Sequence, residues 1–304
     1  MPDGKFTNED IAKAANNVRK RILGLTIDRG GCYLAQACSS AEIVTTMYMN
    51  VLNLGPSLGN PDAQPFPGVP GPDNMDYPKG SLYNGYDSKN PDYSKDRFFV
   101  SCCHYASVIY CTLVEAGRMS ERAIEKFNVD GWNMEMIGAE HSPGFENTAG
   151  SLGQTVSIAA GTAHAYKMKG HTGTIYCMLS DGELEEGQDY ECFQAAAFYG
   201  LDNFVVVADI NHQQLEGWTK DVMNIEPLAD RFEAFGWKAV VVDGHDIEAI
   251  EKAAKTPHKG QPMVLLCQTE PDHGMPIISD QMPKHFIRVT DKTRDKFQEF
   301  YESM

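Results

Sequence analysis

Hydrophobic residues near the start of the chain recur every three or four positions, which is the spacing of an amphipathic helix. The stretch from Thr7 to Asp10 resembles a capping box with Asp in place of Glu, and the apolar run that follows it ends near residues 29–31. A second stretch with apolar residues at helical spacing extends from Ser40 to about Leu52. The pattern predicts two helices, joined by a loop of small residues over 30–39.

In the rest of the chain, short apolar runs alternate with helical segments. Strands are predicted at residues 174–179, 204–208, 238–242 and 263–269, and a further short strand leads to His104. Helices are predicted at residues 154–166, 227–235, 247–254 and 290–304. This alternation predicts an α/β fold: a three-layer, doubly wound and mostly parallel sheet with helices on both faces. We expect residues 1–304 to form a single domain.

Residues 56–85 fit neither the helical nor the strand period. They are rich in Pro, Gly, Asn, Asp and Tyr, and a stretch of this length without a period is usually functional or disordered. We interpret it as a loop insertion that acts as a lid, as a subunit contact or as neither. A subunit contact is favoured because the segment and its end carry four large aromatic side chains: Phe66, Tyr77, Tyr83 and Tyr86.

Composition narrows the class of protein. The net charge of −16 argues against nucleic acid or an anionic membrane surface as a partner. No apolar run approaches the roughly 18 residues of a membrane span, and the polar, acidic N-terminus is unlike a targeting peptide. The eight cysteines show no C-x-x-C spacing, so we expect buried free thiols and a cytoplasmic location.

The chemistry concentrates between residues 173 and 217. Two predicted parallel strands flank a helix there, and polar clusters follow both strands: Ser180-Asp181-Gly182 after the first and residues 209–213 after the second. Asp181 and Asn211 should therefore lie close together and, with a main-chain carbonyl, suit Mg²⁺. Gly182 and the helix after it would receive a phosphate. The alternative is an ordinary turn in which Asp181 is a helix cap.

Asp181-Gly182 followed by Asn211 thirty positions after the aspartate resembles the thiamine diphosphate motif. The flanking residues, 182–188 and 211–217, resemble the transketolase family in particular, and the similarity continues through residues 223–228, 235–237 and 242–246. The resemblance covers nearly the whole chain but only the first half of a complete transketolase. It implies the thiamine diphosphate-binding fold of the family's diphosphate domain.

The resemblance also implies a set of cofactor ligands. Mg²⁺ would be held by Asp181, Asn211 and the main-chain carbonyl of Gln213. The residues implied to contact thiamine diphosphate are His104, Gly150, Ser151, Leu152, Ser180, Asp181, Gly182, Glu183, Asn211 and His285. Ser180 stands where the family has Gly, but its backbone N–H can still meet a phosphate.

Catalytic roles are implied for His104, His141, His285 and Glu186. The three histidines would contact the sugar, and Glu186 corresponds to a family residue at the subunit contact; a solvated charge at a helix start is the alternative for Glu186. The family's first substrate-binding His is absent, since its position falls on Gly31 or Tyr33. Family members carry Gly-His-Pro several residues before Pro-Gly-x-Glu. In this chain that interval is shortened and the Gly-His-Pro word is broken, so His141 is either the replacement for its His or a loop residue without a catalytic role. These departures imply an unusual sugar, for example branched or sulfonated.

Taken together, the resemblance implies the N-terminal subunit of a split transketolase, which moves a two-carbon ketol unit from a ketose to an aldose. A C-terminal subunit with the pyrimidine-binding domain would supply the activating Glu, in a heterotetramer of two plus two chains. Two other readings stay open: an E1 α-type subunit of a 2-oxoacid dehydrogenase, and a non-catalytic paralogue that binds a partner.

Overall fold

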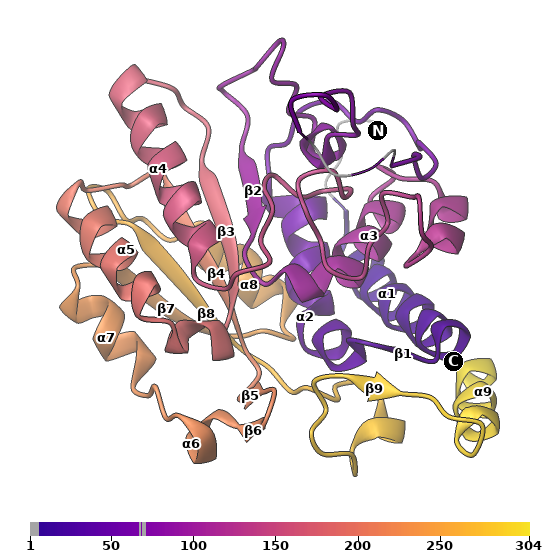
Figure 1. Ribbon diagram of the computed structural model, residues 1–304. Coiled ribbons are helices and arrows are strands. Elements are labelled where there is room, and N and C mark those ends of the chain that lie inside the picture. The colour runs from indigo at the N-terminus through magenta and orange to yellow at the C-terminus, as the bar shows by residue number, and fades with distance from the viewer. Residues whose placement is uncertain (1–5, 67, 69–70) are drawn as a thin grey trace.

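A five-stranded parallel sheet forms the middle layer of the molecule (Figure 1). The structure is a computed structural model that describes residues 6–66, 68 and 71–304. The strand order is β2–β3–β4–β8–β7, and every neighbouring pair is parallel. The strands are β2 (Arg97–Val100), β3 (Ile175–Ser180), β4 (Phe204–Ile210), β7 (Lys238–Asp243) and β8 (Met263–Gln268). The four strands predicted between residues 174 and 269 are all present, within a few residues of their expected ends.

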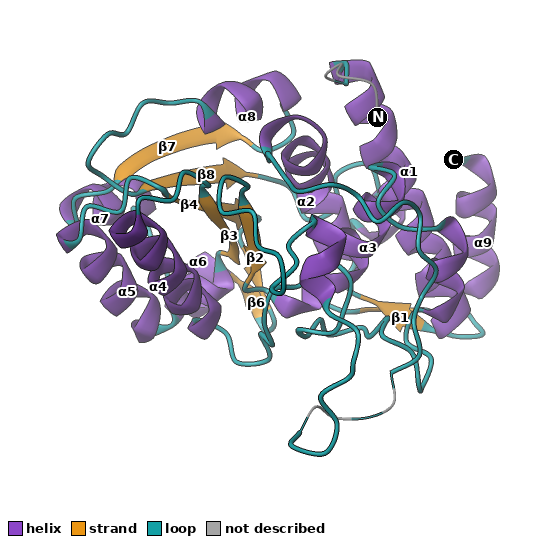
Figure 2. Cartoon of the chain, turned by 90° about the horizontal axis from the view of Figure 1, so that it is seen from above, coloured by secondary structure: helices purple, strands orange, loops and turns teal. Residues whose placement is uncertain are grey.

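Helices cover both faces of this sheet (Figure 2). One face carries α1 (Asn8–Arg29), α2 (Leu34–Thr46), α3 (Ala106–Glu115) and α8 (Ile247–Ala254). The opposite face carries α4 (Gln154–Lys169), α5 (Gly187–Phe198) and α7 (Leu228–Ala234). Each face has its own buried apolar cluster. The prediction of a three-layer, doubly wound α/β fold is confirmed. No helix in the described ranges has the length and apolarity needed to cross a bilayer.

Short elements complete the chain. They are β1 (Gly31–Cys32), β5 (Gln213–Gln214), β6 (Gly217–Trp218), α6 (Thr219–Val222), β9 (Ile287–Arg288) and the closing helix α9 (Arg294–Ser303), which packs against α1. β1 pairs antiparallel with β9, so the segment that follows α1 lies beside the segment that precedes α9 (Figure 1).

The predicted loop over residues 30–39 is wrong. After β1, the helix α2 begins at Leu34, six positions before the expected Ser40. All thirteen residues of α2 are buried. A helix that is buried all round has no polar face, so its first turns carry no amphipathic period for sequence analysis to detect.

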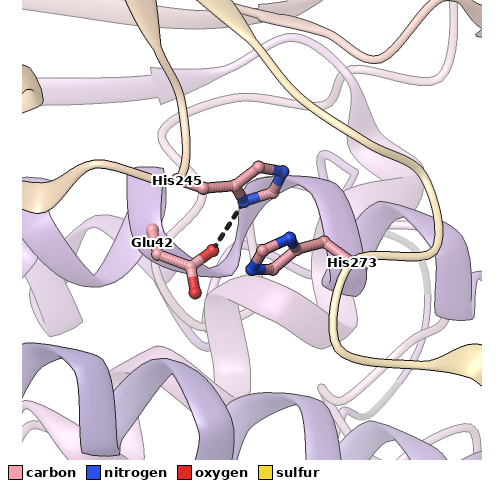
Figure 3. Close-up of side chains that lie close together, drawn as sticks. All are labelled: Glu42, His245 and His273. Atoms are coloured by element: carbon pink, nitrogen blue, oxygen red, sulfur yellow. Dashed lines mark hydrogen bonds and ion pairs between the residues drawn. The ribbon is translucent and has the colours of Figure 1, made fainter.

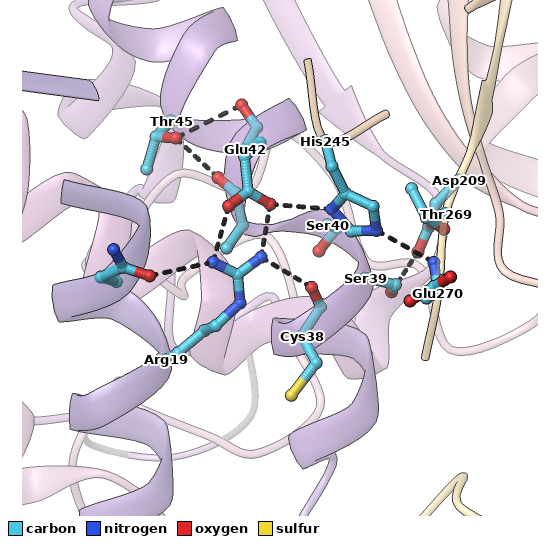
Figure 4. Close-up of polar contacts among 12 residues, drawn as sticks. Arg19, Cys38, Ser39, Ser40, Glu42, Thr45, Asp209, His245, Thr269 and Glu270 are labelled. Carbon is cyan, nitrogen blue, oxygen red and sulfur yellow. Dashed lines mark hydrogen bonds and ion pairs between the residues drawn. The ribbon is translucent and has the colours of Figure 1, made fainter. Parts of the chain in front are cut away.

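An ionic network joins α1, α2 and the turn after β7 (Figure 4). Arg19 forms a bidentate ion pair with Glu42 and also donates to the carbonyl of Cys38 at 2.9 Å. His245 Nδ1 lies 3.1 Å from the second oxygen of Glu42. Burial alone would raise the pKa of Glu42, but the hydrogen bonds from His245 and Arg19 outweigh it and lower the pKa to about 2. The buried charges are therefore balanced within the network.

The insertion at residues 56–85 packs against the segment that follows α3. Phe66 N–H donates to the Gly131 carbonyl at 2.9 Å, and its ring stacks on His141 with 3.8 Å between centroids. The Tyr77 hydroxyl donates to Glu140 at 2.7 Å. These aromatic groups thus find partners within the chain, so their size alone no longer requires a second subunit. The role of the insertion stays a prediction.

Candidate active site at the carboxyl ends of β3 and β4

The two polar clusters that follow β3 and β4 lie side by side. Ser180 is in register with Asp209, and the Asp181 N–H donates to the Asp209 carbonyl at 3.1 Å. The carboxylate of Asp181 accepts hydrogen bonds from the N–H groups of Gly182, at 2.8 Å, and of His212. His212 reaches it with a left-handed backbone, φ 62°. Parallel register therefore brings the Asp181 turn beside the Asn211 turn, as the β-α-β pattern predicts.

Asp209 orients Asn211. The Asn211 amide nitrogen donates to the Asp209 carboxylate at 3.2 Å, which leaves the amide oxygen to accept from the Gln213 N–H at 2.9 Å. Asp209 itself is fully buried and accepts from the hydroxyls of Ser39, at 2.6 Å, and Tyr105, at 2.7 Å. Because a carboxylate only accepts, the amide of Asn211 can take one orientation here.

This pair of carboxylates favours a cation. Asp181 is only 2 % exposed, and burial, followed by the nearby Asp209, raises its pKa well above the usual range. Neither carboxylate forms an ion pair with a lysine or arginine of the described residues. The Asp181 carboxylate, the second lone pair of the Asn211 amide oxygen and the Gln213 carbonyl are oxygen donors of the kind that Mg²⁺ prefers. The residues present therefore fit a resident Mg²⁺.

A cavity of about 400 Å³ opens beside these oxygens. Of the implied cofactor contacts, those that line it are His104, Gly150, Leu152, Ser180, Gly182, Glu183, Asn211 and His285. The other two implied contacts, Ser151 and Asp181, do not line the cavity themselves, but each stands between two lining residues in the sequence. A Cβ on Gly182 would lie 3.0 Å from the Cβ of Gln214, so a side chain at this position would crowd the site. The cavity and the oxygen cluster together form one candidate site.

Glu183 supports the loop at residues 150–153. Its carboxylate accepts from the Gly153 N–H at 2.8 Å and from the Ser101 hydroxyl. Burial raises the pKa of Glu183 to about 7, although these two hydrogen bonds oppose the shift. The helix expected after Gly182 is present, but it begins as a 3-10 turn over Gly182–Glu185 that precedes α5. This turn directs Glu183 inward, where it fixes the loop.

Three rings gather on the other side of the cavity. His104 and His285 have centroids 5.0 Å apart, and Tyr33 lies 5.2 Å from the first and 5.3 Å from the second. Burial, and then the neighbouring His285, lowers the pKa of His104 to about 3. Burial also lowers the pKa of His285. Both imidazoles are therefore neutral hydrogen-bonding groups near neutral pH.

Two residues with an implied catalytic role lie outside the lining of the cavity. The ring of His141 is held by Glu135 and is stacked under Phe66 of the insertion. Glu186 is exposed at the start of α5, beside Gly153. Their catalytic roles stay predictions, and each has the structural partners just named.

Sequence analysis missed several residues of this site. Gln36 and Tyr105 line the cavity, and Asp209 holds Asn211. Gln36 gave no signal, because the pattern at the start of its helix predicts a loop. Asp209 gave a partial signal, since it opens the polar cluster after the predicted strand; only the structure shows that it lies buried inside β4, where a carboxylate needs partners.

A second group of potential metal ligands lies outside the cavity (Figure 3). Ligand atoms of Glu42, His245 and His273 lie within 4.8 Å of one another, and the two rings stack with 3.7 Å between centroids. Arg19 already engages both oxygens of Glu42, and His245 uses its second nitrogen to accept from the Glu270 N–H at 3.0 Å. This group is therefore a balanced ionic network rather than a cation site.

A parallel α/β sheet with an Asp–Asn oxygen cluster beside a cavity at its strand ends defines the diphosphate-binding domain of thiamine diphosphate enzymes. Residues 79–298 match the family described as transketolase, thiamine diphosphate binding domain. The chain belongs to this transketolase family. That result favours the transketolase reading over an E1 α-type subunit.

Similar proteins include a transketolase family protein of Sinorhizobium fredii, 32 % identical over 287 residues, which are 93 % of this chain and 91 % of that one. One of the subunits of the apulose-4-phosphate transketolase of Actinobacillus succinogenes is 29 % identical over 280 residues, 91 % of this chain and 90 % of that one. The solved transketolase of Campylobacter jejuni superposes with a TM-score of 0.76 at 22 % identity, covering 98 % of this chain. The aligned region is 43 % of that structure's chain.

Proposed function

We propose that this chain is the N-terminal subunit of a two-subunit transketolase that transfers a two-carbon ketol unit from a ketose to an aldose. The observation that carries the proposal is the oxygen cluster of Asp181, Asn211 and Gln213 at the edge of a cavity that also holds two neutral histidines. A relative of matching length is named as one subunit of a transketolase, which supports a division of the enzyme into two chains.

In this proposal Asp181, Asn211 and the Gln213 carbonyl hold Mg²⁺, and the backbone around Ser180 and Gly182 receives the diphosphate. Thiamine diphosphate, when bound, supplies the electron sink for breaking and forming the carbon–carbon bond. The chain's own contribution is to hold the metal and to fix the 150–153 loop through Glu183.

The sugar is bound through neutral hydrogen-bonding groups. His104 and His285 meet its hydroxyl and carbonyl oxygens, and Gly31 or Tyr33 occupies the position where the resemblance implies a further His. A residue other than His at this position alters the shape and hydrogen bonding of this end of the cavity, which favours a non-standard ketose; we expect a phosphorylated or otherwise anionic one. Relatives named for apulose-4-phosphate and for 6-deoxy-6-sulfo-D-fructose support a substrate of that class.

Completion of the site requires a partner. The C-terminal subunit supplies the activating Glu, and two copies of each chain form a heterotetramer in the cytoplasm. Large apolar side chains exposed on α4 and α5 support such an assembly: Met168 is 75 % exposed and Phe198 is 82 % exposed. The eight cysteines are buried free thiols, as in proteins of reducing compartments.

The test is a calorimetric titration of thiamine diphosphate with Mg²⁺ into this chain, alone and mixed with the candidate C-terminal subunit, followed by a ketol-transfer assay over a sugar panel. Turnover in the mixture alone is the expected result. Asp181→Ala should weaken Mg²⁺-dependent cofactor binding roughly 100-fold or more, because it removes the only carboxylate ligand. Asp230→Ala, which removes an exposed carboxylate from α7, is the matched control.

Two results would contradict the proposal. Unchanged binding in Asp181→Ala would refute the metal site. Cofactor binding by neither the chain nor the mixture would favour the non-catalytic paralogue.

A further inference from the structure

Gln36 and His285 lie 249 positions apart in the sequence, and the β1–β9 pair brings them together (Figure 1). A Cβ on Gly31, in β1, would lie 2.6 Å from the ring of Phe286, so this close approach needs a glycine. The first turn of α2 is thereby placed against the loop that carries His285. Both Gln36 and His285 line the cavity.

The amide group of the Gln36 side chain contacts the ring of His285. Its amide nitrogen lies 3.0 Å from His285 Nδ1. Gln36 is only 4 % exposed, and its amide oxygen is buried without a hydrogen-bond partner among the described residues. The amide is thus committed to the imidazole and to no other side chain described.

We propose that Gln36 is a positioning residue that holds His285 as the neutral tautomer with its proton on Nε2. An amide NH₂ group only donates, so Nδ1 must accept, and the single ring proton is left on Nε2. Nε2 makes no hydrogen bond within the described ranges. His285 therefore presents an N–H donor to an acceptor oxygen in the cavity.

The opposite orientation of the amide is less favourable. It would let the oxygen accept from Nδ1–H, but it would leave both amide hydrogens buried without an acceptor in the described part of the chain. The orientation shown leaves one hydrogen and the oxygen unpaired. Buried unpaired donors carry a desolvation penalty, and two donors are harder to satisfy than one donor and one oxygen.

The identity of the oxygen that His285 meets rests on the proposed function: it is the carbonyl oxygen of the ketose donor, which can only accept a hydrogen bond. A neutral Nε2–H suits this oxygen, whereas the other tautomer would place two lone pairs against each other. Gln36 would thus favour binding and polarisation of a ketose over a polyol of the same length.

The tautomer is tested directly in the full chain, labelled with ¹⁵N-histidine, by long-range ¹H–¹⁵N correlation at pH 7.5. His285→Asn assigns the signals of this ring. We expect Nε2 to be the protonated nitrogen in the wild-type chain. Gln36→Glu should move the proton to Nδ1, because a carboxylate only accepts, and Gln36→Leu should abolish the preference. Gln298→Leu, the same change on exposed α9, should leave the signals unchanged.

A second measurement uses the chain with its partner subunit, thiamine diphosphate and Mg²⁺. Gln36→Leu should lower kcat/KM for the ketose roughly 3- to 10-fold, the effect of one lost positioning hydrogen bond. A protonated Nδ1 in the wild-type chain, or a tautomer that Gln36→Glu does not move, would overturn the inference. A wild-type complex without ketol transfer would instead overturn the proposed function, since the tautomer is measured without turnover.

Discussion

At the scale of single residues, the site is built from charges and rings that lack the usual partners. Asp181 has carboxylate and backbone neighbours but no described cation in contact, while His104 is nearly enclosed without a carboxylate to hold its proton. Such groups cost folding free energy, and proteins keep them where ligands bind. Their protonation is therefore the property to measure.

His104 should make stability depend on pH. Its folded pKa of about 3 lies below the unfolded value near 6.5, so the unfolded chain binds the proton first as the pH falls. The free energy of unfolding should therefore drop by about 1 kcal/mol between pH 7.5 and 5.5 through this residue. Urea unfolding of the wild-type chain and of His104→Asn at both values measures it. An equal pH dependence in the two proteins would contradict the assignment.

Asp189, in the first turn of α5, should make stability depend on pH in the opposite direction. It is fully buried, neither oxygen has a hydrogen-bond partner among the residues that the structure describes, and burial together with Glu183 and Glu186 raises its pKa to about 8. The unfolded chain loses this proton near pH 4, so stability falls as the pH rises from about 4 to 8. Asp189→Asn should be more stable by about 1–2 kcal/mol at pH 8 and nearly unchanged at pH 4.5.

Urea unfolding at the two pH values tests the Asp189 prediction, with the exposed Asp230→Asn as its control. A gain of similar size at both values would show that packing, rather than ionisation, is responsible.

At the scale of elements, buried charge joins segments that are far apart in sequence. Arg19 belongs to α1, Glu42 to α2 and His245 to the turn between β7 and α8 (Figure 4). Removing one member of the Arg19–Glu42 ion pair leaves the other charged, buried and unpaired. Removing both members leaves no such charge behind.

Glu42→Leu should therefore destabilise the chain by roughly 3–5 kcal/mol, because the Arg19 guanidinium would stay buried without its carboxylate. The double variant Arg19→Met with Glu42→Leu should recover most of that loss. Denaturant unfolding gives both values. Asp62→Ala, which breaks the exposed pair with Arg122, should cost less than about 1 kcal/mol. A double variant as unstable as Glu42→Leu would refute charge burial as the cause.

At the scale of the whole molecule, the helices α4 and α5 lie on the opposite side of the sheet from α1 (Figure 1), and each carries a large apolar side chain exposed to solvent, Met168 and Phe198. A single chain gains nothing from Phe198 in this position, but an assembly can bury it.

Phe198→Asp should weaken binding of the C-terminal subunit by about 10-fold or more, since it places a charge in an apolar interface, and should leave the thermal stability of the isolated chain unchanged. Sedimentation velocity of mixtures measures the association. Met304→Asp, at the exposed end of α9, is the control. Equal association of the two variants would place the interface elsewhere.

The sequence by itself determined the layered fold and the two turns that carry Asp181 and Asn211. Strand and helix periods are local properties, and parallel strands place their carboxyl ends on one edge of the sheet. Tertiary structure alone decided the rest. Asp209 orients Asn211, Gln36 reaches His285 across 249 positions, and Phe66 covers His141. Such contacts depend on how buried segments pack, and the start of α2, buried on all sides, leaves no periodic pattern from which to predict them.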